Sequence, residues 1–345
     1  MTGIRIGKEM EGQEQVRVAS DVMNNHILIT GTSGSGKTVA QKYIERGIVE
    51  DGGSVVVLNY NQTHMDMEGN HMEIIHVRQD GFPMSLIVPV GNERDDQESQ
   101  LEVAQNVLKV LEGIDKLSAR QKAVIRSAIR EMGITCLGEN EFAEIGKKIE
   151  SIGKENKRLE DAAESVLDKY FELFHLVKTG VREVVIPGKI VVIDLSGYDM
   201  RTQKILAELS ISILWRDARR KGGQPPFPAY LILDEFQALD CRKGSMIEEI
   251  LREGRKFGLH LVMATQTLST FPKEIQPVLE IPATKLYFPM VERERRRLAR
   301  QLPYSTEQNE KALSGLKKGT CLATGTFEIG GYPCRRPILL TFWNL

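Results

Sequence analysis

The sequence predicts an α/β fold, in which a mostly parallel sheet is covered by helices on both faces, together with an all-α insertion. Three observations lead to this prediction. Short apolar runs alternate with helical patterns, one of these runs leads into a glycine-rich turn, and the middle of the chain keeps helical periodicity over a long stretch without proline. Parallel strands are buried on both faces, so they read as continuous apolar runs, and helices connect them.

The elements of the α/β part follow one another in a regular order. Compact apolar runs predict buried strands, and the amphipathic segments between them predict helices. We expect strands at residues 25–30, 54–58, 189–194, 230–234 and 260–264. We expect helices at residues 39–50, 202–220 and 244–256.

The chain divides into three predicted parts. Residues 1–25 are a short N-terminal segment, in which four apolar residues suggest edge strands: Ile4, Ile6, Val16 and Val18. Residues 26–96 and 181–345 form the α/β core. Residues 97–180 lack proline and repeat apolar side chains at helical spacing, so they predict a helical insertion of about four helices.

Length and composition exclude several classes of protein. The 345 residues are 41% hydrophobic and 27% charged, as in an ordinary globular protein, which excludes disordered, collagen-like and disulfide-scaffold chains. The four cysteines form no CxxC pair and the six histidines match no metal-binding spacing. No apolar run reaches the roughly 18 residues that cross a bilayer. We therefore expect a cytoplasmic protein without a membrane segment.

The charge is balanced overall but unevenly distributed. The chain has 46 Lys and Arg against 47 Asp and Glu, a net charge of −1. Residues 1–200 carry 23 basic and 32 acidic side chains, whereas residues 201–345 carry 23 basic and 15 acidic ones. A near-neutral total is thus compatible with a localised basic surface.

A phosphate-binding motif follows the first predicted core strand. The sequence Gly31-Thr32-Ser33-Gly34-Ser35-Gly36-Lys37-Thr38 satisfies G-x-x-x-x-G-K-[ST] between a strand and a helix, and Val39 comes next. Glycines let backbone amides curl around phosphates at a helix N-terminus. Lys37 is expected to reach the β- and γ-phosphates of ATP, and Thr38 to offer its hydroxyl to Mg²⁺.

Two carboxylates end a later apolar strand. Asp234 stands at the tip of that strand, where it suits Mg²⁺ coordination, and Glu235 is expected to polarise the water that attacks the γ-phosphate. This pair favours a hydrolase over a small-molecule kinase. Asp194 also ends an apolar strand and competes as the metal-binding aspartate. It lacks an adjacent glutamate, so it ranks below Asp234 and is better explained as the cap of a turn.

A polar strand end and an arginine-rich helix complete the predicted site. Gln266 follows a strand that should neighbour the Asp234 strand, from where it could sense the γ-phosphate. Arg252, Arg255 and Lys256 either form a solvated helix end or include an arginine finger donated to the nucleotide of a neighbouring subunit.

Together these segments resemble the HerA/FtsK superfamily of ring-forming, DNA-translocating ATPases. The resemblance rests on four segments: Asn25–Gly31 with the phosphate loop, Leu233-Asp234-Glu235, Arg252–Leu259 and Ala264-Thr265-Gln266. It implies a RecA-like P-loop NTPase core, a homo-hexamer and duplex DNA in the central channel. It also implies that Arg255, with Arg252 second, acts in trans. The 25 residues before the first core strand are too few for the N-terminal β-barrel usual in HerA, which favours a compact relative.

These features support one leading function and leave alternatives open. The leading hypothesis is an ATP-hydrolysing ring motor that translocates double-stranded DNA with a separate nuclease or other effector protein. An ATP-gated assembly scaffold or regulatory subunit is the first alternative. A conjugation, type IV secretion or genome-packaging ATPase is the second, because one motor fold serves many processes.

Overall fold

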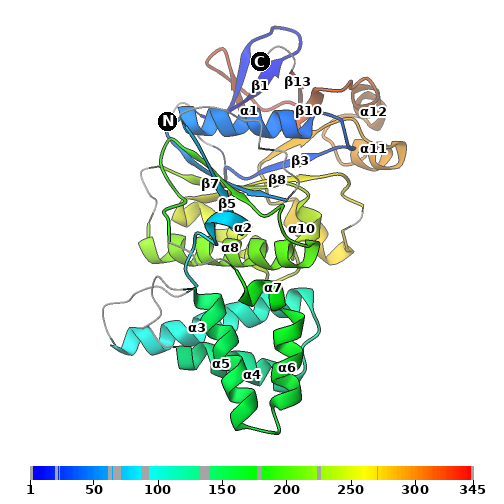
Figure 1. The fold of residues 1–345 in the computed structure, drawn as a ribbon. Coiled ribbons are helices and arrows are strands. Elements are labelled where there is room, and N and C mark those ends of the chain that lie inside the picture. Colours follow the sequence, from blue (N-terminus) through cyan, green and yellow to red (C-terminus); the bar gives the residue numbers. More distant parts are fainter. Residues whose placement is uncertain are drawn as a thin grey trace.

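The computed structural model describes residues 3–19, 22, 24–60, 64, 71–86, 93–132, 140–176, 181–223, 227–269 and 271–342. Within these residues thirteen strands form one sheet in the order β12-β11-β2-β1-β13-β10-β9-β3-β8-β7-β4-β6-β5. Helices lie above and below this sheet, and a separate group of helices extends from one side of the molecule (Figure 1).

Seven adjacent strands of the sheet are parallel. In spatial order they are β9 (Thr284–Tyr287), β3 (Ile27–Thr30), β8 (Leu259–Thr265), β7 (Ala229–Leu233), β4 (Ser54–Asn59), β6 (Ile190–Asp194) and β5 (Met72–His76). All five predicted core strands lie in this half, within one or two residues of their expected bounds. The predicted parallel α/β core is thereby confirmed.

The other half of the sheet is antiparallel, and the sequence predicts only two of its six strands. It contains β10 (Thr320–Thr324), β13 (Ile338–Thr341), β1 (Arg5–Glu9), β2 (Gln15–Val18), β11 (Phe327–Ile329) and β12 (Tyr332–Cys334). The expected edge strands in residues 1–25 are β1 and β2, and their placement at an edge is wrong. Both lie inside the sheet because strands from residues 327–341 pair with them.

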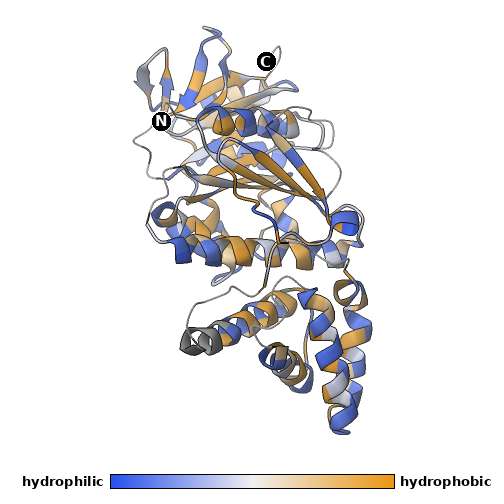
Figure 2. Cartoon of the chain, turned by 60° about the vertical axis from the view of Figure 1, so that its left-hand side comes forward, coloured by the Kyte–Doolittle hydropathy of each residue, from blue (hydrophilic) through white to orange (hydrophobic). Residues whose placement is uncertain are grey.

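Side chains of the parallel strands alternate between two apolar clusters, one on each face. On β4, Val55 and Val57 join the cluster that includes helix α1 (Lys37–Glu50), whereas Val56 and Leu58 join the cluster that includes α8 (Met200–Lys221). Figure 2 shows the sheet mostly in the colour of hydrophobic residues, with mixed colours on the surrounding helices. The prediction of helices on both faces is therefore confirmed.

The remaining helices of the core lie around the sheet. They are α2 (Val77–Asp80), α9 (Met246–Glu253), α10 (Gln276–Leu279), α11 (Glu292–Ala299) and α12 (Thr306–Ser314), with 3₁₀ turns η2 (Phe236–Ala238), η3 (Gly254–Phe257) and η4 (Lys273–Ile275). The helix expected at 244–256 is shorter: α9 ends at Glu253. A Cβ on Gly254 would lie 2.2 Å from the Leu259 oxygen, so the chain passes very close to the start of β8 there.

Residues 93–174 contain the helices α3 (Glu93–Ile114), α4 (Ala119–Met132), α5 (Glu141–Glu155), α6 (Glu160–Lys169) and the short α7 (Phe171–Phe174). The described helices thus number five rather than about four, and the first begins at 93 rather than 97. Their buried side chains belong to the same apolar cluster as those of α8. The division into domains stays a prediction.

Within the described residues, no helix combines the length and the apolar character that crossing a bilayer requires.

Candidate active site

The predicted site residues meet at one edge of the parallel sheet. Strand β8 lies between β3 and β7, with Thr30 opposite Thr265 and Leu233 opposite Met263. The phosphate loop, the Asp234-Glu235 pair and Gln266 directly follow these strands. Since carboxyl ends of neighbouring parallel strands share an edge, three segments far apart in the sequence are brought together, at the place where α/β proteins bind ligands.

The phosphate loop is held tightly from behind. A Cβ on Gly31 would lie 2.5 Å from Cβ of Phe288, so this position requires glycine. Gly36 has a φ of 112°, and its Cβ would lie 3.0 Å from the backbone of Gly319. Ser33 and Gly34 are exposed at the tip, whereas Ser35 is buried. The loop thus presents its backbone outward while its base is fixed.

Lys37 is buried within the loop. Its Nζ donates to the carbonyl oxygens of Gly31 at 2.7 Å and Thr32 at 3.1 Å. Burial lowers the pKa of Lys37, and the nearby carboxylates of Glu235 and Asp234 oppose this change by favouring the charged ammonium. The Lys37 ammonium is therefore held in the loop near two acidic side chains.

Thr38 and Val39 form the first turn of α1 behind Lys37. Thr38 is partly buried, and the Val39 side chain is 54% exposed. The predicted contact of Val39 with a nucleotide stays a prediction.

Asp234 and Glu235 follow β7 in a tight turn. The backbone N–H of Glu235 donates to Oδ1 of Asp234 at 3.0 Å, and Glu235 has a left-handed φ of 48°, which is uncommon for a residue other than glycine. Burial, and secondly the charge of Glu235, raises the pKa of Asp234. This carboxylate is poised for a cation, because a bound divalent ion would relieve both effects.

Gln266 contacts the predicted catalytic glutamate directly. Its Nε2 donates to Oε1 of Glu235 at 2.8 Å, and Gln237 donates to the other carboxylate oxygen. Both amides leave lone pairs of Glu235 available to a water molecule. The predicted neighbourhood of Gln266 and the acidic pair is therefore present, while the sensing role of Gln266 stays a prediction.

The donor set fits Mg²⁺ bound together with a nucleotide. Among the described residues no group of three or more His, Cys, Asp or Glu side chains could hold a metal alone. Mg²⁺ in phosphoryl-transfer sites takes one or two protein oxygens, and phosphates and water supply the remaining ligands. The Thr38 hydroxyl and the Asp234 carboxylate match this requirement.

Asp194 is separate from the site. Strand β6, which it ends, is separated from β7 by β4. Its Oδ1 accepts from Ser196 N at 3.2 Å and from Asn59 at 3.3 Å, and its Oδ2 lies 3.0 Å from His76. Asp194 caps a turn, as expected.

The arginine segment lies at the opposite edge of the sheet. Arg255 and Lys256 belong to η3, just before β8 begins, whereas Gln266 follows the end of β8. At roughly 3.3 Å per residue, β8 separates the two by about 20 Å. Arg252 pairs with Glu248 at 2.8 Å within α9, and Lys256 lies 3.8 Å from Glu253. The structure does not bring Arg252 or Arg255 to the phosphate loop of its own chain.

Sequence reasoning missed two segments that support the phosphate loop. The Pro289 oxygen accepts hydrogen bonds from the N–H and the hydroxyl of Thr32, at 2.9 and 3.0 Å. The N–H of Gly319 donates to the Ser35 oxygen at 2.8 Å. Both partners lie more than 250 residues further along the chain. Pro289 follows β9 and Gly319 precedes β10, two strands that the sequence patterns did not predict, so no local signal could identify them.

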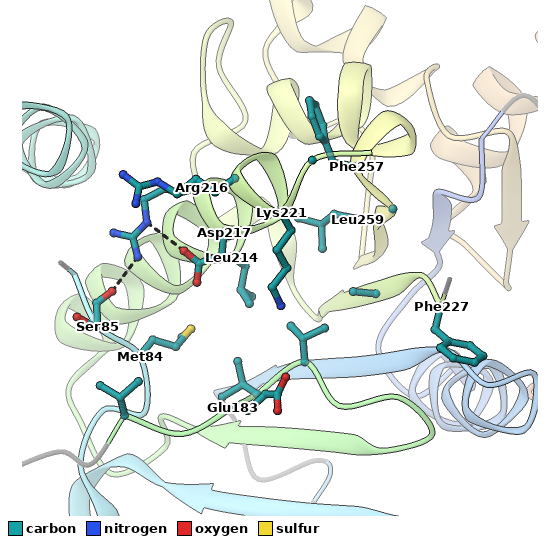
Figure 3. Close-up of a pocket in the computed structure, with 18 of the residues that line it drawn as sticks. Met84, Ser85, Glu183, Leu214, Arg216, Asp217, Lys221, Phe227, Phe257 and Leu259 are labelled. Carbon is teal, nitrogen blue, oxygen red and sulfur yellow. Dashed lines mark hydrogen bonds and ion pairs between the residues drawn. The ribbon is translucent and has the colours of Figure 1, made fainter. Parts of the chain in front are cut away.

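The structure also contains an apolar hollow of about 430 Å³ that lies away from the phosphate loop (Figure 3). Residues at the starts of β7 and β8, Ala229 and Leu259, line it together with the end of α8. Arg216 closes one side, where it donates to the Ser85 oxygen at 3.0 Å and pairs with Asp217. The hollow is at the opposite edge from the phosphate loop and is not part of the site.

Comparison with known proteins agrees with this geometry. A family described as "Helicase HerA, central domain" matches residues 4–212. The chain is 25% identical to a DNA double-strand break repair helicase HerA of Sulfurisphaera tokodaii, over 98% of this chain and 68% of that protein. It is 25% identical to the HerA of Sulfolobus acidocaldarius, over 76% of this chain and 55% of that protein. The chain thus spans between about half and two thirds of these relatives.

Solved structures resemble the chain over nearly its whole length. VirB4 of Thermoanaerobacter pseudethanolicus has a TM-score of 0.75 at 18% identity, covering 99% of this chain and 96% of that chain. The plasmid coupling protein TrwB with the ATP analogue ADPNP has a TM-score of 0.65 at 17% identity, covering 99% and 94%. These likenesses show that the fold is that of RecA-like P-loop ATPases.

Proposed function

The chain belongs to the family of the HerA helicase central domain, and we propose that it is an ATP-hydrolysing motor that moves double-stranded DNA. One observation carries the hydrolytic part: Gln266 is hydrogen-bonded to Glu235, next to Asp234 and at the sheet edge that carries the phosphate loop. The names of the curated relatives, which are DNA repair helicases, support DNA as the substrate.

The residues of the site divide the chemistry among them. The backbone amides of residues 31–37 and the Lys37 ammonium bind the phosphates of ATP, and Thr38 and Asp234 hold Mg²⁺. Mg²⁺, when bound, neutralises charge on the β- and γ-phosphates. Glu235 accepts the proton of the attacking water, and Gln266 holds the Glu235 carboxylate in place at 2.8 Å.

We propose a homo-hexamer in which Arg255 completes the site of the adjacent subunit. The position of Arg255 supports this role, because η3 lies at the sheet edge opposite the phosphate loop. Arg252 is the second candidate, and its guanidinium is paired with Glu248. A nuclease or other effector partner and a cytoplasmic location stay predictions from the sequence.

Substitution of Glu235 tests the proposal. The variant Glu235→Gln keeps the shape of the side chain and loses the base, so ATP hydrolysis should fall by about 10²-fold or more while ATP binding persists. Duplex DNA should increase the rate of ATP hydrolysis by the wild type. The wild type should also displace a protein roadblock from that DNA, whereas Glu235→Gln should displace none. Glu164→Gln, exposed on α6, is the matched control and should behave as the wild type.

Two results would contradict the proposal. Hydrolysis by Glu235→Gln at more than about a tenth of the wild-type rate would exclude the role of Glu235. If DNA does not change the rate of ATP hydrolysis by the wild type and the wild type displaces no roadblock, the scaffold or regulatory alternative would be favoured.

A further inference from the structure

Helix α11 presents a row of arginines beside the candidate active site. Three arginines of α11 and Arg300, the C-cap residue that follows it, line a groove of about 460 Å³ together with Ser269, Glu292 and Glu294. The four are here called the arginine surface: Arg293, Arg296, Arg297 and Arg300. The row covers seven residue steps of helix, roughly 10 Å at 1.5 Å per residue. This length fits a succession of phosphates better than a single one.

Part of this positive charge is not neutralised by the protein. Arg296 is paired with Glu292 and lies 3.7 Å from Glu310, and Arg297 donates to Oε1 of Gln276 at 2.8 Å. Arg293 and Arg300 are exposed, and neither has a hydrogen-bond or ion-pair partner in the part of the chain that the structure describes. Exposed guanidinium groups in such a row are suited to phosphate oxygens.

The segment before α11 is bonded to the phosphate loop. Pro289 precedes the helix by three residues, and its oxygen accepts both hydrogen bonds from Thr32. Phe288 fills the space against Gly31. A displacement of α11 is therefore transmitted to the loop that holds the nucleotide phosphates.

The helix itself is bonded to the segment after Gln266. Glu294 is 8% exposed, and its Oε1 accepts from the Thr267 hydroxyl at 2.6 Å and from the Ser269 N–H at 3.0 Å. Burial opposes ionisation of Glu294, but these hydrogen bonds and the charge of Arg297 lower its pKa overall, so it is a carboxylate at neutral pH. Helix α11 is thus connected to both loops that contact the nucleotide.

We propose that the arginine surface of α11 binds the phosphate backbone of duplex DNA, and that Glu294 couples this contact to the loop carrying Gln266. The proposal rests on the proposed function. DNA bound at Arg293 and Arg300 favours one position of α11, and the hydrogen bonds of Glu294 and Pro289 pass this position to Gln266 and Thr32. Glu294 is a positioning residue, because it acts through its hydrogen bonds to Thr267 and Ser269.

Charge reversal of the two unpaired arginines tests whether α11 binds DNA. We expect Arg293→Glu with Arg300→Glu to weaken binding of a fluorescent duplex, in the presence of ADPNP, by at least about tenfold. The slope of log K against log salt should fall by about one for each DNA phosphate that the variant no longer neutralises. Arg126→Glu with Arg130→Glu, exposed on α4, makes the same charge change and should bind within about twofold of the wild type.

The outcomes separate this inference from the proposed function. If the wild type binds DNA and the α11 variant binds equally with the same salt slope, the inference is wrong and the proposed function stands. If the α11 variant binds DNA normally but loses hydrolysis, the arginines act on a nucleotide and the inference is also wrong. If the wild type neither binds duplex DNA nor responds to it, the proposed function fails first.

Two substitutions of Glu294 test the coupling. Glu294→Ala removes the oxygen that accepts both hydrogen bonds, and it should abolish most of the DNA stimulation of hydrolysis while DNA binding persists. Glu294→Gln keeps a carbonyl oxygen for Thr267 and Ser269, so it should retain most of the stimulation. Unchanged stimulation in a folded Glu294→Ala protein, or equal loss in both variants, would overturn the coupling role.

Discussion

Asp234 illustrates how single residues of this site are held in a state that a ligand would relieve. Its carboxylate is partly buried next to Glu235, and both conditions raise its pKa. In the folded protein without ligand, the charged form is therefore less favourable than in the unfolded chain. Such a residue lowers the free energy of unfolding at neutral pH, and it raises that free energy only when a cation is bound to it.

Replacement of Asp234 should consequently stabilise the protein without nucleotide and Mg²⁺. A carboxyl group whose folded-state pKa is raised loses stability as pH rises from its unfolded pKa through its folded pKa. Asp234→Asn should therefore raise Tm by about 1–3 °C at neutral pH, and by less as the pH is lowered toward 4. Thermal unfolding followed by circular dichroism measures this change.

The exposed Asp168 on α6 provides the control for this experiment. Asp168→Asn should change Tm little at either pH. A lower Tm for Asp234→Asn at neutral pH would show that the carboxylate is already stabilised by contacts within the protein.

For single residues, the sequence predicted the roles of those that belong to a local motif. It did not predict the contacts of residues whose partners lie far away in the chain. The phosphate loop, Asp234-Glu235 and Gln266 each directly follow a compact apolar strand, so their chemistry and position could be inferred together. The hydrogen bonds from Thr32 to Pro289 span 257 residues. No property of either residue indicates such a pairing before the sheet is known.

At the scale of elements, local patterns predicted five of the seven parallel strands, missed β5 and β9, and predicted the end of one helix poorly. The pattern at 244–256 favours a continuous helix, but Gly254 lies against the Leu259 backbone and the last turn becomes η3. The close approach of η3 to β8 is a tertiary contact, which periodicity does not encode.

Gly254→Ala should therefore destabilise the protein and displace the arginine segment. Its Cβ would lie 2.2 Å from the Leu259 oxygen, so the backbone must move, at a cost of about 2 kcal/mol or more. Denaturant unfolding measures the loss. Gly315→Ala is the matched control, because its Cβ would lie no closer than 3.5 Å to its neighbours, and a similar cost in both variants would refute the argument.

Helix α9 also connects the arginine segment with the helical group of residues 93–174. Glu249 on α9 accepts from the Trp215 ring of α8 at 3.1 Å and pairs with Lys109 of α3 at 3.3 Å. The helix that precedes Arg255 is thus supported on two sides by buried or partly buried contacts.

At the scale of the whole molecule, the uneven charge has a structural counterpart. The basic half of the sequence includes both the arginine segment at one sheet edge and the arginine surface near the other. A net charge of −1 is compatible with a DNA motor if several subunits bring such surfaces together. Electrostatic binding of this kind weakens steeply with salt.

A mixture of two inactive variants tests the ring. Lys37→Ala should lose phosphate binding and Arg255→Ala should lose the proposed trans arginine, so each alone should hydrolyse little ATP. In mixed rings a site of an Arg255→Ala subunit can receive Arg255 from a Lys37→Ala neighbour. If sites act independently, about a quarter of wild-type activity should return at equal proportions.

The control for the ring is a mixture of Lys37→Ala with Glu235→Gln. Lys37 and Glu235 both act in the site of their own subunit, so every subunit in the mixture lacks one of the two. No site regains all of its catalytic residues, and activity should stay low. Equal activity in the two mixtures would exclude a trans role for Arg255.

The antiparallel half of the sheet has a consequence for how the chain folds. Strand β1 pairs with β13, and Lys8 lies opposite Thr341, so the partner is synthesised more than 300 residues later. Until then β1 and β2 can pair only with each other, and their outer edges lack the strands β13 and β11. Pairings so distant in sequence are slow to form and leave exposed strands that other molecules can capture. We therefore expect the nascent chain to depend on chaperones until residues 327–341 have left the ribosome.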